Sequence, residues 1–81
     1  MHLTLYSRPG CHLCEEMKAV IDRAVHGNAF TVEVIDISTD AELEARYGLE
    51  IPVLLVNGKK TAKYRISESA LTRILSAEAG G

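Results

Sequence analysis

The 81-residue chain has few of the features that would direct it to a membrane or to nucleic acid. No apolar stretch approaches the roughly 20 residues that span a bilayer, and the first residues lack the basic and apolar regions of a secretory signal. Lysine and arginine number 9 against 11 aspartates and glutamates, so the formal net charge is −2. A charge this small predicts no general attraction to nucleic acid or to an anionic membrane. We therefore expect a cytoplasmic protein that binds neither.

Cysteine is also scarce, because the sequence contains only Cys11 and Cys14. A structural zinc site needs four ligands, and the remaining candidates are the three histidines His2, His12 and His26. They form no second ligand pair, so we predict no metal site. A disulfide that serves only stability is also disfavoured, because a loop this short restricts the unfolded chain little.

The position of the two cysteines favours redox chemistry. They belong to the segment Tyr6-Ser7-Arg8-Pro9-Gly10-Cys11-His12-Leu13-Cys14, between an alternating strand pattern and an amphipathic helix pattern. A helix N-terminus carries unpaired N–H groups and a partial positive charge, which stabilise a thiolate at Cys11. Cys14 follows one turn later and can attack a mixed disulfide formed at Cys11. The spacing therefore predicts a nucleophile at Cys11 and a resolving thiol at Cys14.

Hydrophobic periodicity predicts the element order β-α-β-α-β-β-α. The expected strands cover residues 2–6, 30–37, 52–56 and 59–65. The first helix starts at the cysteine pair and stops at Gly27-Asn28, the second starts at a capping box opened by Thr39 and stops at Gly48, and the third is capped by Ser67.

The connections fix the expected sheet. A right-handed crossover makes the first two strands parallel, and Asn57-Gly58 predicts a tight hairpin between the last two. The result is a single α/β domain over residues 1–81, with a four-stranded mixed sheet, helices on both faces and the cysteine pair at the carboxyl end of the first strand.

With these features the chain resembles the thioredoxin-like superfamily, and most closely a small glutaredoxin-like protein. The resemblance runs from His2 to Leu75 and rests on the cysteine segment, on Ile51-Pro52-Val53-Leu54-Leu55 and on Asn57-Gly58. It implies a thioredoxin-like fold, a cis-proline at Pro52 beside the cysteines, and pairing of the substrate with the backbone at Ile51. The residues alone would favour a trans bond, since about 5–6% of X–Pro bonds are cis.

The sequence also departs from glutaredoxins and thioredoxins around the cysteines. His12 and Leu13 stand where glutaredoxins usually carry proline and tyrosine, and the tryptophan that precedes the pair in thioredoxins is missing. A protonated His12 would favour a thiolate at Cys11. The alternative is that His12 is an exposed residue of the first helical turn without a role in the chemistry.

Glutathione recognition is supported by some residues and opposed by others. Arg8 matches a basic residue that holds a carboxylate in glutathione-binding members, and Arg46 matches a second. Against this, such members carry a glycine pair before the last helix, where this chain has bulky residues at Tyr64-Arg65 or Arg65-Ile66. These side chains oppose a close approach of glutathione to the backbone.

The sequence thus predicts a thiol–disulfide oxidoreductase that reduces protein disulfides or glutathionylated thiols. Cys11 and Cys14 are the expected catalytic residues, and the expected substrate-binding residues are Arg8, His12, Leu13, Ile51 and Pro52. We expect a monomer with no bound cofactor, and glutathione or a dedicated reductase as its reductant. The alternative is a redox-inactive thioredoxin-fold adaptor module. Such a module should lack a cysteine or the proline, and this chain has all three.

Overall fold

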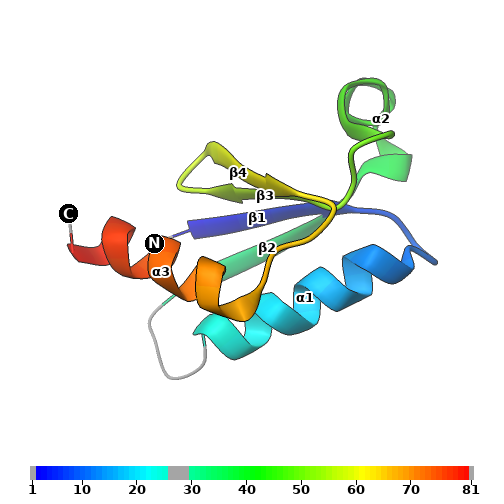
Figure 1. Cartoon of the computed structure of the whole chain (residues 1–81). Coiled ribbons are helices and arrows are strands. Elements are labelled where there is room, and N and C mark those ends of the chain that lie inside the picture. The colour runs from blue at the N-terminus through cyan, green and yellow to red at the C-terminus, as the bar shows by residue number, and fades with distance from the viewer. Residues whose placement is uncertain (1, 26–29, 81) are drawn as a thin grey trace.

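A computed structural model of the protein describes residues 2–25 and 30–80. The strands are β1 (His2–Ser7), β2 (Thr31–Asp36), β3 (Val53–Val56) and β4 (Lys59–Lys63). The helices are α1 (His12–Val25), α2 (Ala41–Tyr47) and α3 (Glu68–Gly80), with a 3₁₀ turn, η1 (Ile37–Thr39), before α2 (Figure 1). The predicted order of strands and α-helices is confirmed. His26 and the predicted helix stop at Gly27-Asn28 lie outside the described residues.

The sheet has the predicted mixed topology, with strand order β2-β1-β3-β4. β1 pairs parallel with β2 and antiparallel with β3, and β3 pairs antiparallel with β4. Asn57 and Gly58 form the tight turn between β3 and β4 with φ values of 50° and 82°. Both residue types tolerate positive φ, which is why this pair predicts the hairpin correctly.

The main core lies between the sheet and two helices. α1 and α3 pack side by side against the same face of the sheet (Figure 1). The buried cluster combines strand and helix residues, namely Leu3, Leu5, Met17, Ile21, Leu54, Val56, Leu71 and Leu75. None of the described helices has the length and the apolar character that a bilayer span requires.

The third helix, α2, lies at the end of the sheet that carries the cysteine pair (Figure 1). Successive strand residues point to opposite faces, so Tyr6 faces away from the core that buries Leu5. The Tyr6 ring stacks on Tyr47 of α2 at 4.7 Å between centroids. Helices therefore occupy both sides of the sheet, but on the second side α2 contacts the end of β1 rather than the middle of the sheet.

The start of α2 corrects the prediction of a capping box opened by Thr39. The N-cap is Asp40, whose carboxylate accepts hydrogen bonds from the N–H groups of Glu42 and Leu43 at 3.0 and 3.2 Å. Thr39 belongs to η1 instead, where its hydroxyl donates to the carbonyl of Asp36 at 3.0 Å. The helix consequently begins one residue later than the capping-box pattern indicates.

The end of β4 is also earlier than predicted. The strand stops at Lys63 because Tyr64 has φ 68° and the N–H of Arg65 donates to the carbonyl of Lys63 at 2.8 Å, closing a three-residue turn. Tyr64 therefore leaves the inner face of the strand and is 43% exposed. The segment from Tyr64 to Ser67 then leads directly into α3.

Candidate active site

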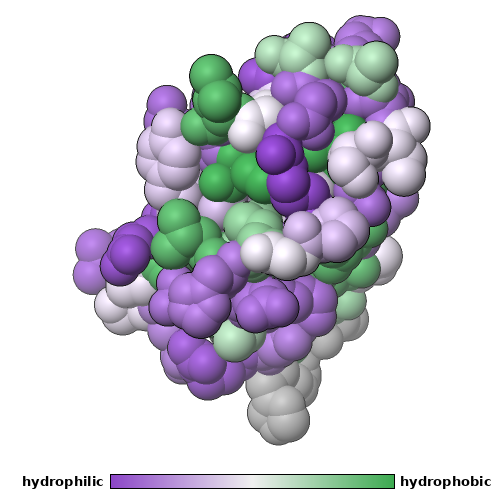
Figure 2. All heavy atoms as spheres, turned by 90° about the vertical axis from the view of Figure 1, so that its right-hand side faces the viewer, coloured by the Kyte–Doolittle hydropathy of each residue, from purple (hydrophilic) through white to green (hydrophobic). Residues whose placement is uncertain are grey.

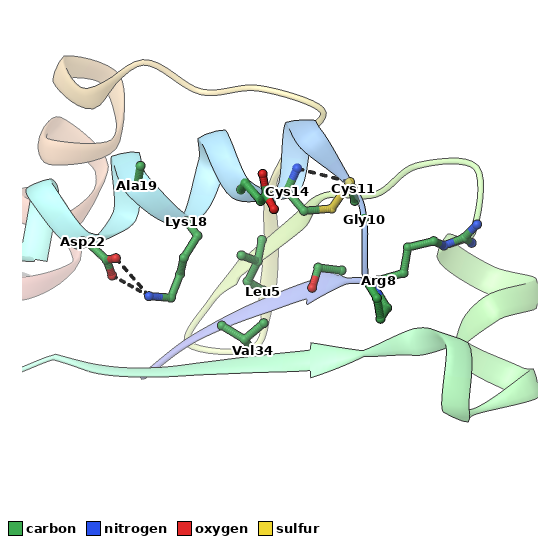
Figure 3. Close-up of a pocket in the computed structure, with 12 residues that line it drawn as sticks. Leu5, Arg8, Gly10, Cys11, Cys14, Lys18, Ala19, Asp22 and Val34 are labelled. Carbon is green, nitrogen blue, oxygen red and sulfur yellow. Dashed lines mark hydrogen bonds and ion pairs between the residues drawn. A yellow bond between two sulfur atoms is a disulfide. The ribbon is translucent and has the colours of Figure 1, made fainter.

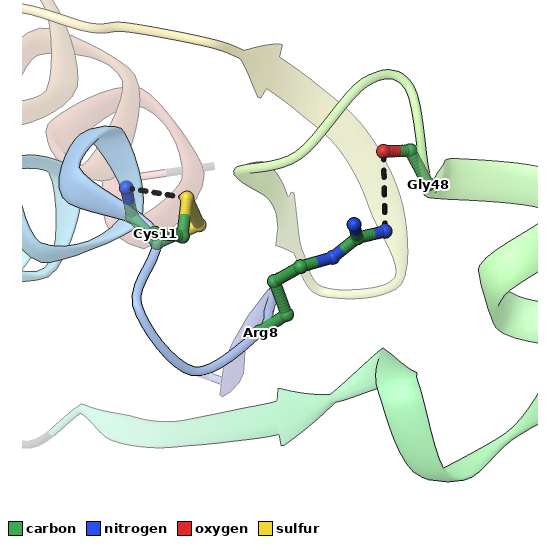
Figure 4. Close-up of a disulfide and its surroundings, with 4 residues drawn as sticks. Arg8, Cys11 and Gly48 are labelled. Atoms are coloured by element: carbon green, nitrogen blue, oxygen red, sulfur yellow. Dashed lines mark hydrogen bonds between the residues drawn. A yellow bond between two sulfur atoms is a disulfide. The ribbon is translucent and has the colours of Figure 1, made fainter.

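Cys11 and Cys14 form a disulfide at the start of α1, next to the carboxyl end of β1 (Figure 4). Their Cα atoms are 5.2 Å apart. The turn that joins β1 to α1 reverses at Gly10, whose φ of 77° is unfavourable for any residue with a side chain, and the N–H of Cys11 donates to the carbonyl of Arg8 at 3.4 Å. The cysteine pair thus lies at the carboxyl end of the first strand, as predicted.

The two sulfurs have different surroundings. The Sγ of Cys11 accepts a hydrogen bond from the N–H of Cys14 at 3.2 Å, so it caps the positive end of α1. Cys11 is partly exposed, whereas Cys14 is 5% exposed. When the pair is reduced, the same N–H group and helix end favour a thiolate at Cys11, whereas burial favours the neutral thiol at Cys14.

A cavity of about 400 Å³ lies beside α1 on the side of β2 (Figure 3). Both cysteines line it, and Leu5 and Val34 form its apolar floor, with Val34 48% exposed. The ammonium of Lys18 lies 2.7 and 3.0 Å from the carboxylate oxygens of Asp22 along its wall. Sequence reasoning did not single out Lys18, although its position four residues after Cys14 places both on one flank of the helix.

A second hollow, of about 160 Å³, lies on the other side of α1, against the segment that precedes α3. Leu13 lines it together with Tyr64, Arg65 and Ile66. Figure 2 shows the end of the molecule that carries the cysteine pair, where hydrophobic patches lie among polar side chains.

Tyr64 connects this hollow to the segment before β3. Its N–H donates to the carbonyl of Pro52 at 2.9 Å, and its hydroxyl donates to the carbonyl of Leu49 at 3.2 Å. Pro52 is buried, and the Ile51–Pro52 peptide bond is cis. Of the predicted substrate-binding residues, Leu13 thus shares the hollow with Tyr64, and Pro52 accepts a hydrogen bond from the N–H of Tyr64.

Arg8 extends away from the disulfide toward α2 (Figure 4). Its guanidinium is paired with the carboxylate of Glu44 and also donates to the carbonyl of Gly48 at 3.4 Å. A Cβ at position 48 would lie 2.5 Å from the carbonyl oxygen of Glu44 and 3.3 Å from the guanidinium, so a side chain at this position would force its neighbours to move. The second arginine considered for glutathione, Arg46, lies with its guanidinium 5.3 Å from the ring centre of Tyr47. Both arginines are therefore engaged around α2.

His12 projects into solvent at the first turn of α1. Its side chain is 83% exposed, and its Nε2 lies 3.9 Å from a carboxylate oxygen of Glu16, one turn further along the helix. This geometry agrees with the alternative of an exposed first-turn histidine. Over residues 2–25 and 30–80, no three side chains of the His, Cys, Asp or Glu types are grouped as metal ligands would be.

Two carboxylates near the site are held in their ionised form. Hydrogen bonds from the hydroxyl and the N–H of Ser38 lower the pKa of Asp36, which terminates β2, and the charge of Arg8 adds a smaller effect. The pKa of Glu50, just before Ile51, is lowered chiefly by its hydrogen bond to the ammonium of Lys60. Both carboxylates therefore stay ionised to a lower pH than ordinary Asp and Glu side chains do.

The fold and the cysteine pair define a protein of the thioredoxin fold. Residues 2–76 match the family described as Glutaredoxin-like domain (DUF836), so the chain belongs to that family. The Glutaredoxin-like protein YDR286C homolog of Dictyostelium discoideum is 32% identical over 77 residues, which cover 88% of this chain and 71% of the relative. The resemblance to glutaredoxin-like proteins is thereby confirmed.

Solved structures support the same fold. The X-ray structure of the structural genomics target protein XcR50 from X. campestris is 36% identical and superposes with a TM-score of 0.77, covering 93% of this chain and 96% of that one. Thioredoxin 1 from Thermosipho africanus is 16% identical with a TM-score of 0.70, over 99% of this chain and 96% of its own. The second likeness concerns the fold alone.

Proposed function

We propose that the protein is a thiol–disulfide oxidoreductase that cycles between a Cys11/Cys14 dithiol and the corresponding disulfide. The observation that carries this proposal is the unequal pair at the start of α1, where Cys11 caps the helix and is partly exposed while Cys14 is 5% exposed. Membership of the glutaredoxin-like family supports it. The reaction takes place in the cytoplasm, where cellular reductants keep thiols available.

The proposed reaction consists of two thiol exchanges. The Cys11 thiolate attacks one sulfur of a substrate disulfide, a bond forms between the two, and the other substrate sulfur leaves with the electron pair and takes a proton. The Cys14 thiolate then attacks the Cys11 sulfur, and the second substrate thiol leaves. The substrate has gained two electrons and two protons, and the protein holds the Cys11–Cys14 disulfide. A thiol reductant, glutathione or a dedicated reductase, restores the dithiol.

Substrate contacts are proposed around the hollow next to α1. Leu13 and Tyr64 line this hollow, and the backbone of Tyr64 is bonded to Pro52. An extended substrate segment would pair with the backbone at Ile51. Arg8 contributes by holding the carbonyl of Gly48, at the start of the loop that leads to Ile51. His12 lies at the exposed rim of the same end of α1.

The preferred substrate class is a polypeptide disulfide rather than a glutathione mixed disulfide. Arg8 is already paired with Glu44, so a glutathione carboxylate at this guanidinium would have to compete with that ion pair. The guanidinium of Arg46 lies over the ring of its neighbour Tyr47. Tyr64 places an aromatic ring where its φ of 68° would suit glycine. We expect the same enzyme preparation to turn over a polypeptide disulfide faster than a small glutathione mixed disulfide.

The variant Tyr64→Gly tests the reason for this preference. Glycine accepts the backbone conformation of Tyr64 and removes the ring, so turnover of the glutathione mixed disulfide should rise relative to the polypeptide. Tyr64→Phe is the matched control, since it keeps the ring and loses the hydroxyl, and its preference should stay that of the unaltered protein. Efficient, saturable turnover of the glutathione substrate by the unaltered protein would contradict the proposed substrate class. If the folded protein turned over neither substrate, the adaptor module would become the better explanation.

A further inference from the structure

The resolving step makes a chemical demand on Cys14 that its position does not favour. Cys14 has to become a thiolate before it can attack the mixed disulfide at Cys11. It is 5% exposed, and burial favours the neutral thiol over the charged form. The helix end and the N–H group that help Cys11 are directed at the sulfur of Cys11. Another group is therefore needed to stabilise negative charge at Cys14.

Lys18 is placed to meet this demand from the cavity that Cys14 lines. Residues four apart on a helix have Cβ atoms about 5–6 Å apart, and helical side chains lean toward the N-terminus, so the Lys18 ammonium can reach the sulfur of Cys14. In the disulfide form Cys14 carries no charge, and the ammonium instead pairs with Asp22 (Figure 3). That carboxylate is 57% exposed, so this ion pair adds little stability and can be exchanged.

Among the charged groups of the described residues that line the cavity, only Lys18 can stabilise a thiolate at Cys14. Glu15, on the same helix, is negative and would oppose a thiolate. Arg8, from the loop before α1, is paired with Glu44 of α2 and donates to the carbonyl of Gly48, the residue after that helix. Figure 4 shows the contact with Gly48. Among the described residues, β1 and β2 contribute Leu5, Ser7 and Val34 to the lining, and none of these is charged.

We propose that Lys18 exchanges Asp22 for the Cys14 thiolate when the pair is reduced, and that this contact accelerates the resolving step. The Cys14 thiol gives its proton to water in the cavity, the sulfur attacks the Cys11 sulfur, and the electron pair of the broken bond leaves with the substrate thiolate. The inference rests on the proposed oxidoreductase function, because it concerns the second exchange of that reaction.

A stopped-flow reaction with a neutral chromogenic disulfide, dipyridyl disulfide, separates the two exchanges. The attack by Cys11 releases the first equivalent of coloured thione, and the attack by Cys14 releases the second. A second phase whose rate does not depend on reagent concentration reports the resolving step, because direct attack of Cys14 on the reagent would become faster as the reagent is increased. Lys18→Met should leave the first phase unchanged and slow the second about threefold at pH 7. The loss of the Lys18 charge is taken to disfavour the Cys14 thiolate by about one pKa unit, which lowers the fraction of thiolate about tenfold. The more basic thiolate is a better nucleophile, which recovers part of this loss and leaves about a threefold slower step.

Three further variants make the test specific. Lys18→Arg keeps the cation and should restore most of the second-phase rate, whereas Asp22→Asn removes the competing carboxylate and should accelerate that phase. Arg23→Met, a loss of the same charge on the same helix outside the cavity lining, should leave both phases unchanged. At high pH the second phase of Lys18→Met should be as fast as that of the unaltered protein, because the Cys14 thiol is then ionised in both.

The outcomes distinguish this inference from the function on which it rests. A second phase that is equally fast in Lys18→Met and the unaltered protein, or equally slowed in Lys18→Met and Arg23→Met, would overturn the role of Lys18 and leave the oxidoreductase intact. Release of a single equivalent of thione by the unaltered protein, or a second phase whose rate rises with reagent concentration, would instead contradict the proposed function itself.

Discussion

Replacing Cys11 with serine should abolish disulfide exchange, whereas replacing Cys14 with serine should trap the substrate on Cys11. The first variant loses the sulfur that caps α1 and is partly exposed. The second keeps this sulfur and loses the thiol that releases the mixed disulfide. Cys14→Ser should therefore carry out the first exchange and stop there, with one substrate half attached to each protein molecule.

Mass analysis after mixing each variant with a polypeptide disulfide measures this outcome directly. Cys14→Ser should accumulate a stable adduct at Cys11, and Cys11→Ser should accumulate none. Alkylation provides an independent check, since the thiol of Cys14→Ser should react at neutral pH faster than free cysteine. If the adduct formed instead in Cys11→Ser, or if the thiol of Cys14→Ser reacted no faster than free cysteine, the assigned nucleophile would be wrong.

Leu54→Ala should remove a large part of the stability of the fold. Leu54 is fully buried in β3, an interior strand, and belongs to the core cluster between the sheet and the helices α1 and α3. Truncating a buried leucine costs about 2–5 kcal/mol, against a total stability of about 5–15 kcal/mol for a domain. Urea unfolding of the two proteins should show this difference as a lower midpoint with a similar slope.

The chain offers a matched control for this substitution. Leu49→Ala removes the same atoms from a residue that is 95% exposed, and it should change the free energy of unfolding by less than about 0.5 kcal/mol. Equal losses in the two variants would contradict the position of the core between the sheet and the helices α1 and α3.

Local patterns were sufficient for the framework of the fold. Asn57 and Gly58 predict the hairpin because few residue pairs accept two positive φ values, and the apolar run that includes Val53 and Leu54 indicates an interior strand. The cysteine pair at the junction of β1 and α1 follows from the same patterns. These features depend on residues that are neighbours in the sequence, so a single sequence is enough to recognise them.

Two of the features that sequence reasoning missed depend on contacts between distant residues. The positive φ of Tyr64 accompanies its hydrogen bond to Pro52, and this conformation ends β4 before the predicted residue. The pairing of Arg8 with Glu44 could not be predicted, because the position of α2 relative to β1 is not visible in periodicity. The start of α2 was ambiguous for a local reason, since both Thr39 and Asp40 are good cap residues and η1 determines which of them serves.

Titration of the two thiols in a glutathione redox buffer, with mass analysis of the species at each ratio, tests the central claim most directly. The proposed cycle predicts that the protein passes from the dithiol to an intramolecular Cys11–Cys14 disulfide, with the loss of two hydrogens and few glutathione adducts. Thiols that stayed reduced at every ratio, or that collected glutathione without forming the intramolecular disulfide, would contradict the assignment of this pair as a redox centre.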